Sequence, residues 1–282
     1  MRWLVVGANG MLGQDLVQVL RSAGGDVTPV DRDEVDITDP AAALAGCAGQ
    51  DVVVNCAAFT AVDPAEEDEA TAFSINAVGA ANLATASRAA GARIVHISTD
   101  YVFGGDATSP YPEDAPLAPR SAYGRTKAAG EWAVRAGNPD HLVVRTAYLY
   151  GANGACFPRT IVRIAREKGG LDVITDQVGQ PTWTVDLSDL IARLVLAEAP
   201  AGTYHGTSSG QTSWHGFARE AVRAAGMDPD IVRTTTSDAF VRPAPRPAYS
   251  VLGHDALRAV GVEPIGGWLD RWAHAAPSVL GG

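Results

Sequence analysis

Lysine, cysteine and long apolar runs are scarce in this chain of 282 residues. Its cysteines, Cys47, Cys56 and Cys156, are too few and too widely spaced for a disulfide framework, which predicts reduced thiols and a cytoplasmic location. The first residues lack the charged start and long apolar core of a secretory signal, and no uncharged apolar run reaches the roughly 18 residues that a membrane span needs. A net charge of -10 with scattered arginines disfavours nucleic acid as a partner. The partner is therefore expected to be a small molecule or another protein.

Short β-branched runs alternate with alanine-rich stretches of helical period along the first half of the chain. The β-branched runs lie at residues 2–7, 26–31, 51–57, 92–98 and 141–147, and the helical stretches at 11–24, 40–49, 67–91 and 123–137. Strands that are apolar on both faces are typical of a parallel sheet covered by helices. The pattern predicts an α/β fold with a doubly wound parallel sheet of the Rossmann type.

This alternation weakens after about residue 150, where proline, glycine, threonine and tryptophan become more frequent. We expect residues 1–150 to form a dinucleotide-binding domain and residues 151–282 to form a smaller, mainly substrate-binding part. Part of 182–207 is expected to pack back on the Rossmann-type domain. No internal repeat or low-complexity linker separates the two, so they are expected to fold as one unit.

The segment GANGMLG follows the first predicted strand and opens a predicted helix. Its glycines, Gly7, Gly10 and Gly13, let the backbone turn sharply and approach a pyrophosphate at the helix N-terminus. Asp31 ends the second predicted strand, 18 residues after Gly13. This is close to the sequence separation at which an acidic residue binds the ribose hydroxyls of a dinucleotide. Arg32 follows immediately and suits a 2′-phosphate, so the pair leaves the choice between NADH and NADPH open.

Only two of the 22 basic residues are lysines, Lys127 and Lys168. Lys127 lies four residues after Tyr123 in a predicted helix, which places both side chains on one face. A nearby ammonium favours the phenolate, so Lys127 is expected to lower the pKa of Tyr123. A compact ammonium also reaches ribose hydroxyls, whereas a guanidinium is bulkier and distributes its charge differently. Lys168 is expected in a solvated turn.

The segment HISTDYVF runs from a predicted strand into Thr99, Asp100 and Tyr101. Sheets of this class bind ligands at the carboxyl ends of their strands, which is where Thr99 lies. Its hydroxyl is expected to hydrogen-bond a substrate carbonyl and to share a developing oxyanion with Tyr123. A glycine loop, a threonine at a strand end and a tyrosine four residues before a lysine are together far less expected by chance than any one of them.

These motifs together carry a family resemblance. The glycine spacing, NCAA at 55–58, Asn76, Thr99 and the YxxxK pair are similar to those of an extended short-chain dehydrogenase/reductase. Within that superfamily, STDYVF, AYGRTK, RTAYLYG, DQVGQPTW and RPAYSVL (246–252) resemble the dTDP-4-dehydrorhamnose reductase family over nearly the whole chain. Relatives that act as 4,6-dehydratases carry a glutamate where this chain has Tyr101, so the resemblance disfavours dehydration.

The resemblance implies NADPH- or NADH-dependent reduction of the C4 ketone of a dTDP-linked 4-keto-6-deoxyhexose, most directly dTDP-4-dehydro-L-rhamnose to dTDP-L-rhamnose. Tyr123 would donate the proton while Thr99 positions the ketone. Lys127 would tune the tyrosine, and Asn76 would hold a water for proton relay. The implied cofactor cradle consists of Gly7, Asn9, Gly10, Met11, Gly13, Asp31, Arg32, Ala57, Ala58, Tyr123 and Lys127. The implied substrate contacts are Thr99, Asp100, Tyr101, Tyr148, Phe157 and Arg246.

Two departures from the family pattern lie where the sugar nucleotide is expected. Cys156 precedes Phe157 where an asparagine is frequent, and Tyr148 stands where tryptophan is frequent. The sugar therefore stays open, with another dTDP-4-keto sugar, such as the dihydrostreptose precursor, as the alternative. A non-catalytic NADP-binding module similar to the regulatory subunit of methionine adenosyltransferase is a further alternative.

Asp15 matches a position at which similar proteins place a carboxylate near magnesium at a dimer contact. A single aspartate on a helix is usually a solvated charge, so we predict no metal site. The resemblance is compatible with a homodimer and with a nucleotide-sugar substrate as the partner.

Overall fold

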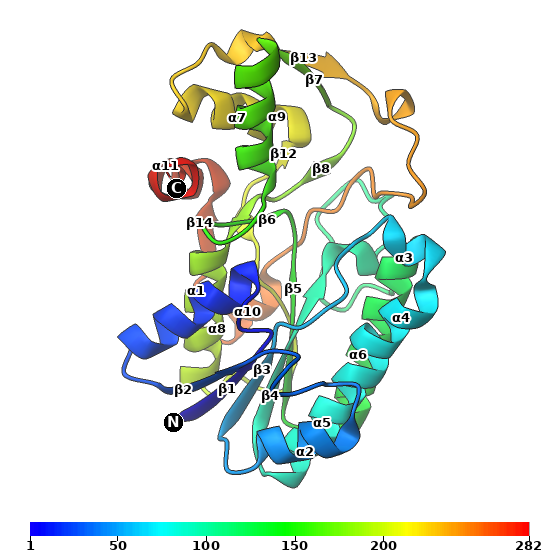
Figure 1. Cartoon of the computed structure of the whole chain (residues 1–282), viewed down its shortest axis with the longest axis vertical. Coiled ribbons are helices and arrows are strands. Elements are labelled where there is room, and N and C mark those ends of the chain that lie inside the picture. Colours follow the sequence, from blue (N-terminus) through cyan, green and yellow to red (C-terminus); the bar gives the residue numbers. More distant parts are fainter. Residues whose placement is uncertain (282) are drawn as a thin grey trace.

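A six-stranded parallel sheet forms the centre of the larger lobe (Figure 1). The computed structural model describes residues 1–281. The strands follow the order β10-β5-β4-β3-β1-β2, and every neighbouring pair is parallel. Their bounds are β1 (Arg2–Val6), β2 (Asp26–Val30), β3 (Val52–Asn55), β4 (Arg93–Thr99), β5 (His141–Thr146) and β10 (Gly202–His205). The predicted doubly wound α/β fold is confirmed, and β10 adds a strand that the sequence pattern did not single out.

Helices cover both faces of this sheet, because its strands direct apolar side chains to both faces. On β1, Trp3 and Val5 face one core, while Leu4 and Val6 face the other, because successive side chains point to opposite faces of a strand. The first core is covered by α1 (Met11–Ser22) and α8 (Thr184–Leu196), and the second by α2 (Pro40–Cys47), α5 (Ala80–Ala89) and α6 (Ala122–Gly137). The strand β10 and the helix α8 thus bring a distant part of the chain onto the sheet.

Two elements differ from the sequence-based expectation. The edge strand β2 exposes Thr28 and Pro29 instead of being apolar on both faces, and an edge position suits proline because its nitrogen cannot donate to a neighbour. The helical stretch expected over 67–91 is divided into α3 (Pro64–Glu67), α4 (Glu69–Phe73), a π-helical turn (Ser74–Gly79) and α5. Turns of this kind occur frequently at functional sites, and this one carries Asn76.

The second lobe lies above the sheet in Figure 1 and consists of helices joined by short strand pairs. The helices of this lobe are α7 (Phe157–Lys168), α9 (Trp214–Ala224) and α11 (Trp268–Leu280), whereas α10 (Asp255–Ala259) packs against β10 of the large sheet. Short 3-10 turns lie at Asp100–Val102, directly after β4, and at Pro229–Ile231 and Ser237–Ala239. The pairs are β6 (Leu149–Tyr150) with β9 (Thr182–Trp183), β7 (Leu171–Ile174) with β13 (Val232–Thr235), β8 (Val178–Gly179) with β12 (Thr212–Ser213), and β11 (Ser208–Ser209) with β14 (Ile265–Gly267). Tyr150, Phe217 and Trp272 form the aromatic centre of this lobe. Within residues 1–281, no helix is long and apolar enough to cross a membrane.

Candidate active site

A cleft of about 920 Å³ opens at the carboxyl ends of the sheet strands, where the second lobe meets the sheet. Most of the site residues proposed from the sequence line this one cleft: Gly7, Gly10, Met11, Gly13, Asp31, Arg32, Ala57, Ala58, Thr99, Asp100, Tyr101, Tyr123, Lys127, Tyr148 and Phe157. Asn9 and Arg246 are outside this lining. The individual roles of these residues stay predictions, but the fold brings them together.

The glycine loop is packed so closely that side chains do not fit at two of its positions. Gly7 has a φ of +78°, and a Cβ there would lie 2.7 Å from the Ala57 nitrogen. A Cβ on Gly13 would lie 2.2 Å from the Gly7 carbonyl oxygen. The helix α1 begins directly after this loop, and its N-cap, Gly10, provides no side-chain hydrogen bond to the free amides. An uncapped helix N-terminus beside a bare backbone suits an anion.

Asp31 and Arg32 both line the cleft, but Asp31 is engaged by backbone N–H groups and the Arg32 side chain is exposed. Both carboxylate oxygens of Asp31 accept backbone N–H groups, from Asn9 at 3.0 Å and from Arg32 at 2.8 Å. Asn9 thus contributes to the shape of the loop rather than to the lining. The Arg32 side chain is 82% exposed, and its only close carboxylate is Asp36, 3.9 Å away. Among the described residues, Arg32 is therefore a cation that is available to a bound phosphate.

The Thr99 hydroxyl lies at the end of β4 and lines the same cleft as Tyr123. It donates to Asp100 Oδ1 at 2.9 Å and accepts from the Tyr101 N–H at 3.2 Å, which caps the following 3-10 turn. Burial raises the pKa of Tyr123 to about 12, while a hydrogen bond with the Thr99 hydroxyl works to lower it. The Tyr101 ring packs edge-on against Tyr123, with centroids 5.6 Å apart.

Lys127 differs from the sequence-based expectation in what it contacts. Its side chain is buried, and Nζ donates to the Ile97 carbonyl oxygen at 2.6 Å. Burial lowers the pKa of Lys127 to about 8, and the charge of Glu131 opposes this shift. A hydrogen bond with Thr99 favours the ionised form of Tyr123 and lowers its pKa. The expected effect of the lysine on the pKa of the tyrosine stays a prediction.

Asp100 is a buried carboxyl group that faces the cleft. Its Oδ2 atom has no hydrogen-bond partner among the described residues. Burial raises the pKa of Asp100 to about 6, although the hydroxyls of Ser250 and Thr99 favour its ionised form. The group therefore changes charge close to neutral pH, within one residue of Thr99.

Aromatic rings form the opposite wall of the cleft. The rings of Tyr148 and Trp214 stack with centroids 3.7 Å apart, and Phe157 lies 4.5 Å from Trp214. Tyr148 has a φ of +47°, which is rare for a residue with a side chain. A Cβ on Gly179 would lie 2.6 Å from Tyr148 Cζ, so the glycine leaves room for the ring. Trp214 was missed from the sequence, where no motif or periodicity marks it.

The structure places Arg246 in an ion pair instead of in the cleft lining. Its guanidinium holds both Asp63 oxygens, at 2.8 and 2.7 Å, and this pairing lowers the pKa of Asp63 to about 2. The pair ties the RPAYSVL segment to the loop before α3. A contact between Arg246 and substrate stays a prediction, and it requires this pair to open.

Asn76 uses its side chain to hold the protein together. Its carboxamide accepts from the Phe59 N–H at 2.8 Å and donates to the Phe59 carbonyl and to Thr126 Oγ1. Both amide hydrogens are therefore engaged, so a relay water at this residue would have to be held by other atoms.

Asp15 is not the solvated charge that was expected. It is buried, and it accepts hydrogen bonds from Thr184 and from Asn153, the latter at 2.9 Å. Burial raises its pKa. Among residues 1–281, His, Cys, Asp and Glu side chains form no group of three or more that would hold a metal ion.

Comparison with known proteins places these features in a family. Residues 1–279 match the model of the RmlD substrate binding domain. The chain is 48% identical to a probable dTDP-4,6-dihydroxy-2-methyloxan-3-one 4-ketoreductase of Streptomyces antibioticus, over 99% of this chain and 96% of that protein. It is 47% identical to a dTDP-4-dehydrorhamnose reductase of Streptomyces griseus, over 99% of this chain and 94% of that protein. A dTDP-4-dehydrorhamnose reductase structure from Bacillus anthracis, in complex with NADP, superposes with a TM-score of 0.93 at 36% identity, covering 97% of this chain and 98% of that one.

Proposed function

This chain belongs to the RmlD substrate binding domain family, and we propose that it reduces the C4 ketone of a dTDP-linked 4-keto-6-deoxyhexose with NADPH or NADH. One observation carries the proposal. Thr99, Tyr123 and Lys127 converge with the glycine loop in a single cleft. Residues 1–150 would hold the dinucleotide, and residues 151–282 would form most of the sugar-nucleotide side. A homodimer and a cytoplasmic location stay predictions.

The glycine loop fits a dinucleotide. Gly7 and Gly13 have no space for a Cβ, and the uncapped start of α1 offers amide hydrogens to a pyrophosphate. Asp31 and Arg32 stand at the rim, where an adenosine ribose would lie in a Rossmann-type fold. When bound, the nicotinamide supplies the hydride, and the protein supplies orientation and proton transfer.

Tyr123 is the proton donor in this proposal. Its phenol keeps its proton over the whole physiological range, because burial raises its pKa to about 12. An alkoxide on the sugar is a stronger base than a phenolate, so the proton moves to the alkoxide as the ketone is reduced. When substrate binds, the Thr99 hydroxyl would turn from Asp100 to the ketone oxygen and share the developing oxyanion with Tyr123.

Tyr101 favours reduction over dehydration. Its ring packs against Tyr123, and burial raises the pKa of its phenol above the usual range. A neutral aromatic wall at this position provides no carboxylate to take a proton from the sugar ring. This supports a reductase that leaves the carbon skeleton of its substrate unchanged.

We expect NADPH and NADH to bind with dissociation constants within about tenfold of each other, a difference of about 1.4 kcal/mol. The reason is that Asp31 suits ribose hydroxyls while the exposed Arg32 suits a 2′-phosphate. Arg32→Ala should weaken NADPH binding and leave NADH binding unchanged, which fluorescence titration of both cofactors measures. Arg166→Ala, at an exposed site on α7, is the matched control. A thousandfold preference of the native protein for one cofactor would contradict this expectation.

The identity of the sugar is tested by a coupled reaction. The purified protein is combined with a dTDP-glucose dehydratase, a 3,5-epimerase and NADPH, and the product is identified by mass spectrometry and NMR. Recovery of dTDP-L-rhamnose is the expected result.

Two other outcomes have distinct meanings. Turnover of another dTDP-4-keto sugar, but not of the rhamnose precursor, would keep the reductase class and reject the rhamnose assignment. The relative from Streptomyces antibioticus is named as a 4-ketoreductase of a different dTDP sugar, which supplies one alternative substrate to test. If the protein bound NADPH or NADH but no keto sugar led to oxidation of the cofactor, the result would favour the non-catalytic NADP-binding module.

A further inference from the structure

Glu131 is a fully buried carboxylate that lies one helical turn after Lys127 on α6. Arg145 holds it with two bonds of 2.9 Å, from Nε to Oε1 and from Nη2 to Oε2. The Ser98 hydroxyl donates to Oε1 at 2.6 Å, and Arg135 donates to Oε2 at 2.9 Å. Four hydrogen bonds on one buried carboxylate keep it ionised, and they lower its pKa against the effect of burial.

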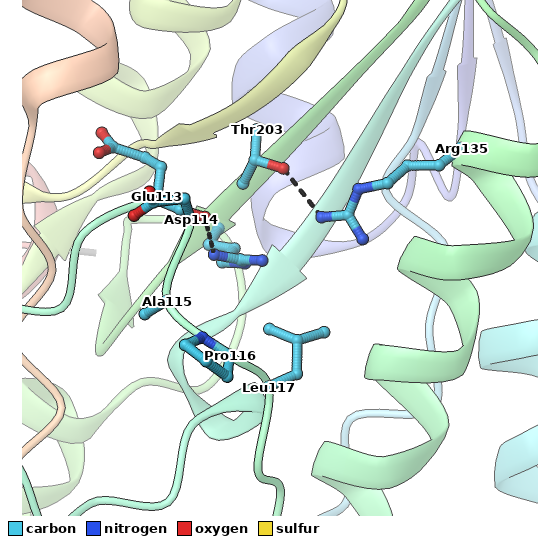
Figure 2. A pocket seen from close by; sticks show the side chains of 8 residues that line it. Glu113, Asp114, Ala115, Pro116, Leu117, Arg135 and Thr203 are labelled. Carbon is cyan, nitrogen blue, oxygen red and sulfur yellow. Dashed lines mark hydrogen bonds between the residues drawn. The ribbon is translucent and has the colours of Figure 1, made fainter.

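These contacts link the catalytic cleft to the β10 edge of the sheet. Ser98 precedes Thr99 on β4, so its bond to Glu131 joins the end of that strand to α6. At the other end, Arg135 donates to Thr203 at 2.8 Å beside a second cavity of about 460 Å³. Figure 2 shows this bond, with Glu113 and Asp114 across the cavity. The network thus runs from the catalytic residues to solvent.

The other titratable groups near the lysine and the glutamate carry no charge at neutral pH or lie one contact further away. Burial lowers the pKa of His96 well below its usual value and raises that of the Cys56 thiol to about 12. His205 contacts Arg145 at 3.3 Å, and burial lowers its pKa to about 3. Glu113 lies 4.0 Å from His205, and burial raises its pKa. Glu131 is therefore the carboxylate that acts most directly on the lysine.

We propose that Glu131 is a positioning residue of the reaction: its buried carboxylate, held by Arg145, Arg135 and Ser98 one helical turn after Lys127, keeps that lysine an ammonium. The inference rests on the proposed reductase function. A buried lysine without an opposite charge tends to lose its proton. As a neutral amine, Lys127 would lose part of its capacity to donate to Ile97 and to ribose hydroxyls. Arg145 and Arg135 in turn hold the glutamate in its charged form.

The presence of only two lysines makes a direct test possible. Protein grown with isotope-labelled lysine shows two side-chain NMR signals, which Lys168→Arg assigns. The Lys127 signal should titrate near pH 8 in the native protein. In Glu131→Gln its midpoint should fall by about one pH unit, because the opposite charge is gone. Glu131→Asp, which keeps the charge, should restore most of the native midpoint.

A second variant keeps the proposal falsifiable if Glu131→Gln does not fold. Arg135→Gln removes a partly exposed cation from the network, so the Lys127 midpoint should move upward instead of downward. An unchanged Lys127 midpoint in Glu131→Gln or, where that variant does not fold, in Arg135→Gln would overturn the proposal. The measurement needs neither cofactor nor substrate, so its failure is distinguishable from failure of the reductase assignment.

Activity provides an independent measurement. The native kcat/KM for NADPH should decline as pH rises through about 8, because the ammonium is lost above the Lys127 pKa and kcat/KM reports groups of the free enzyme. In Glu131→Gln this decline should begin about one pH unit lower, with near-native kcat/KM at about pH 6 where the lysine is charged in both proteins. A uniform loss at every pH would show a purely structural role and overturn the proposal.

Discussion

Tyr123→Phe is expected to lower kcat/KM by about 100-fold or more, or about 2.7 kcal/mol of transition-state stabilisation, because it removes the proton donor. The phenyl ring retains its edge-on packing against Tyr101. The Thr99 hydroxyl retains its bond to Asp100 at 2.9 Å. The loss should therefore appear in the rate, measured as oxidation of NADPH with saturating and limiting keto sugar, and leave the fold in place.

Tyr204→Phe is the matched control for this change. Tyr204 lies on β10, outside the cleft lining, and its hydroxyl donates to the Pro200 carbonyl oxygen at 2.8 Å. Loss of that hydrogen bond should cost about 1 kcal/mol of stability and leave kcat/KM within about twofold. If Tyr123→Phe retained more than about a tenth of the native kcat/KM, another group would have to supply the proton.

Lys127→Arg is expected to lower kcat/KM by at least about tenfold, equivalent to about 1.4 kcal/mol, although the positive charge is kept. The ammonium is buried and reaches the Ile97 carbonyl oxygen at 2.6 Å. A planar guanidinium is larger, so it would displace its charge from this position and from any ribose hydroxyl. Overpacking of the buried site adds a stability cost of about 1–3 kcal/mol, which the sequence did not predict.

Lys168→Arg is the control for this substitution, because it makes the same chemical change at the exposed end of α7. It should change stability by no more than about 0.5 kcal/mol and leave kcat/KM unchanged. Steady-state rates for both variants should be taken well below their Tm values, so that unfolding does not enter the comparison. Near-native kcat/KM in Lys127→Arg would mean that any cation suffices at this position.

Several features of the site could be predicted because they depend on residues close in the chain. Tyr123 and Lys127 share a face because α6 is a helix and they are four residues apart. Gly7 takes a φ of +78° at a turn where glycine is the residue without steric penalty. Thr99 lies at the end of its strand because the β-branched run stops there. Backbone preference and periodicity are local, so the sequence alone carries this information.

Other features depend on which surfaces pack together, and only the tertiary structure decided them. Asp63 and Arg246 are 183 residues apart, and their pairing removed Arg246 from the cleft lining. Trp214 reaches Tyr148 because α9 packs over the cleft, and no local pattern marks that ring.

The charge state of the site was decided in the same way. Lys127 titrates near pH 8 because the surrounding elements exclude water from it, and Glu131 limits that shift because Arg145 from β5 holds it in place. The sequence by itself determined the types and local order of the catalytic residues. Burial and long-range ion pairs determined their pKa values and their orientation, because solvent exclusion and Coulomb interactions depend on distances through space rather than on separation along the chain.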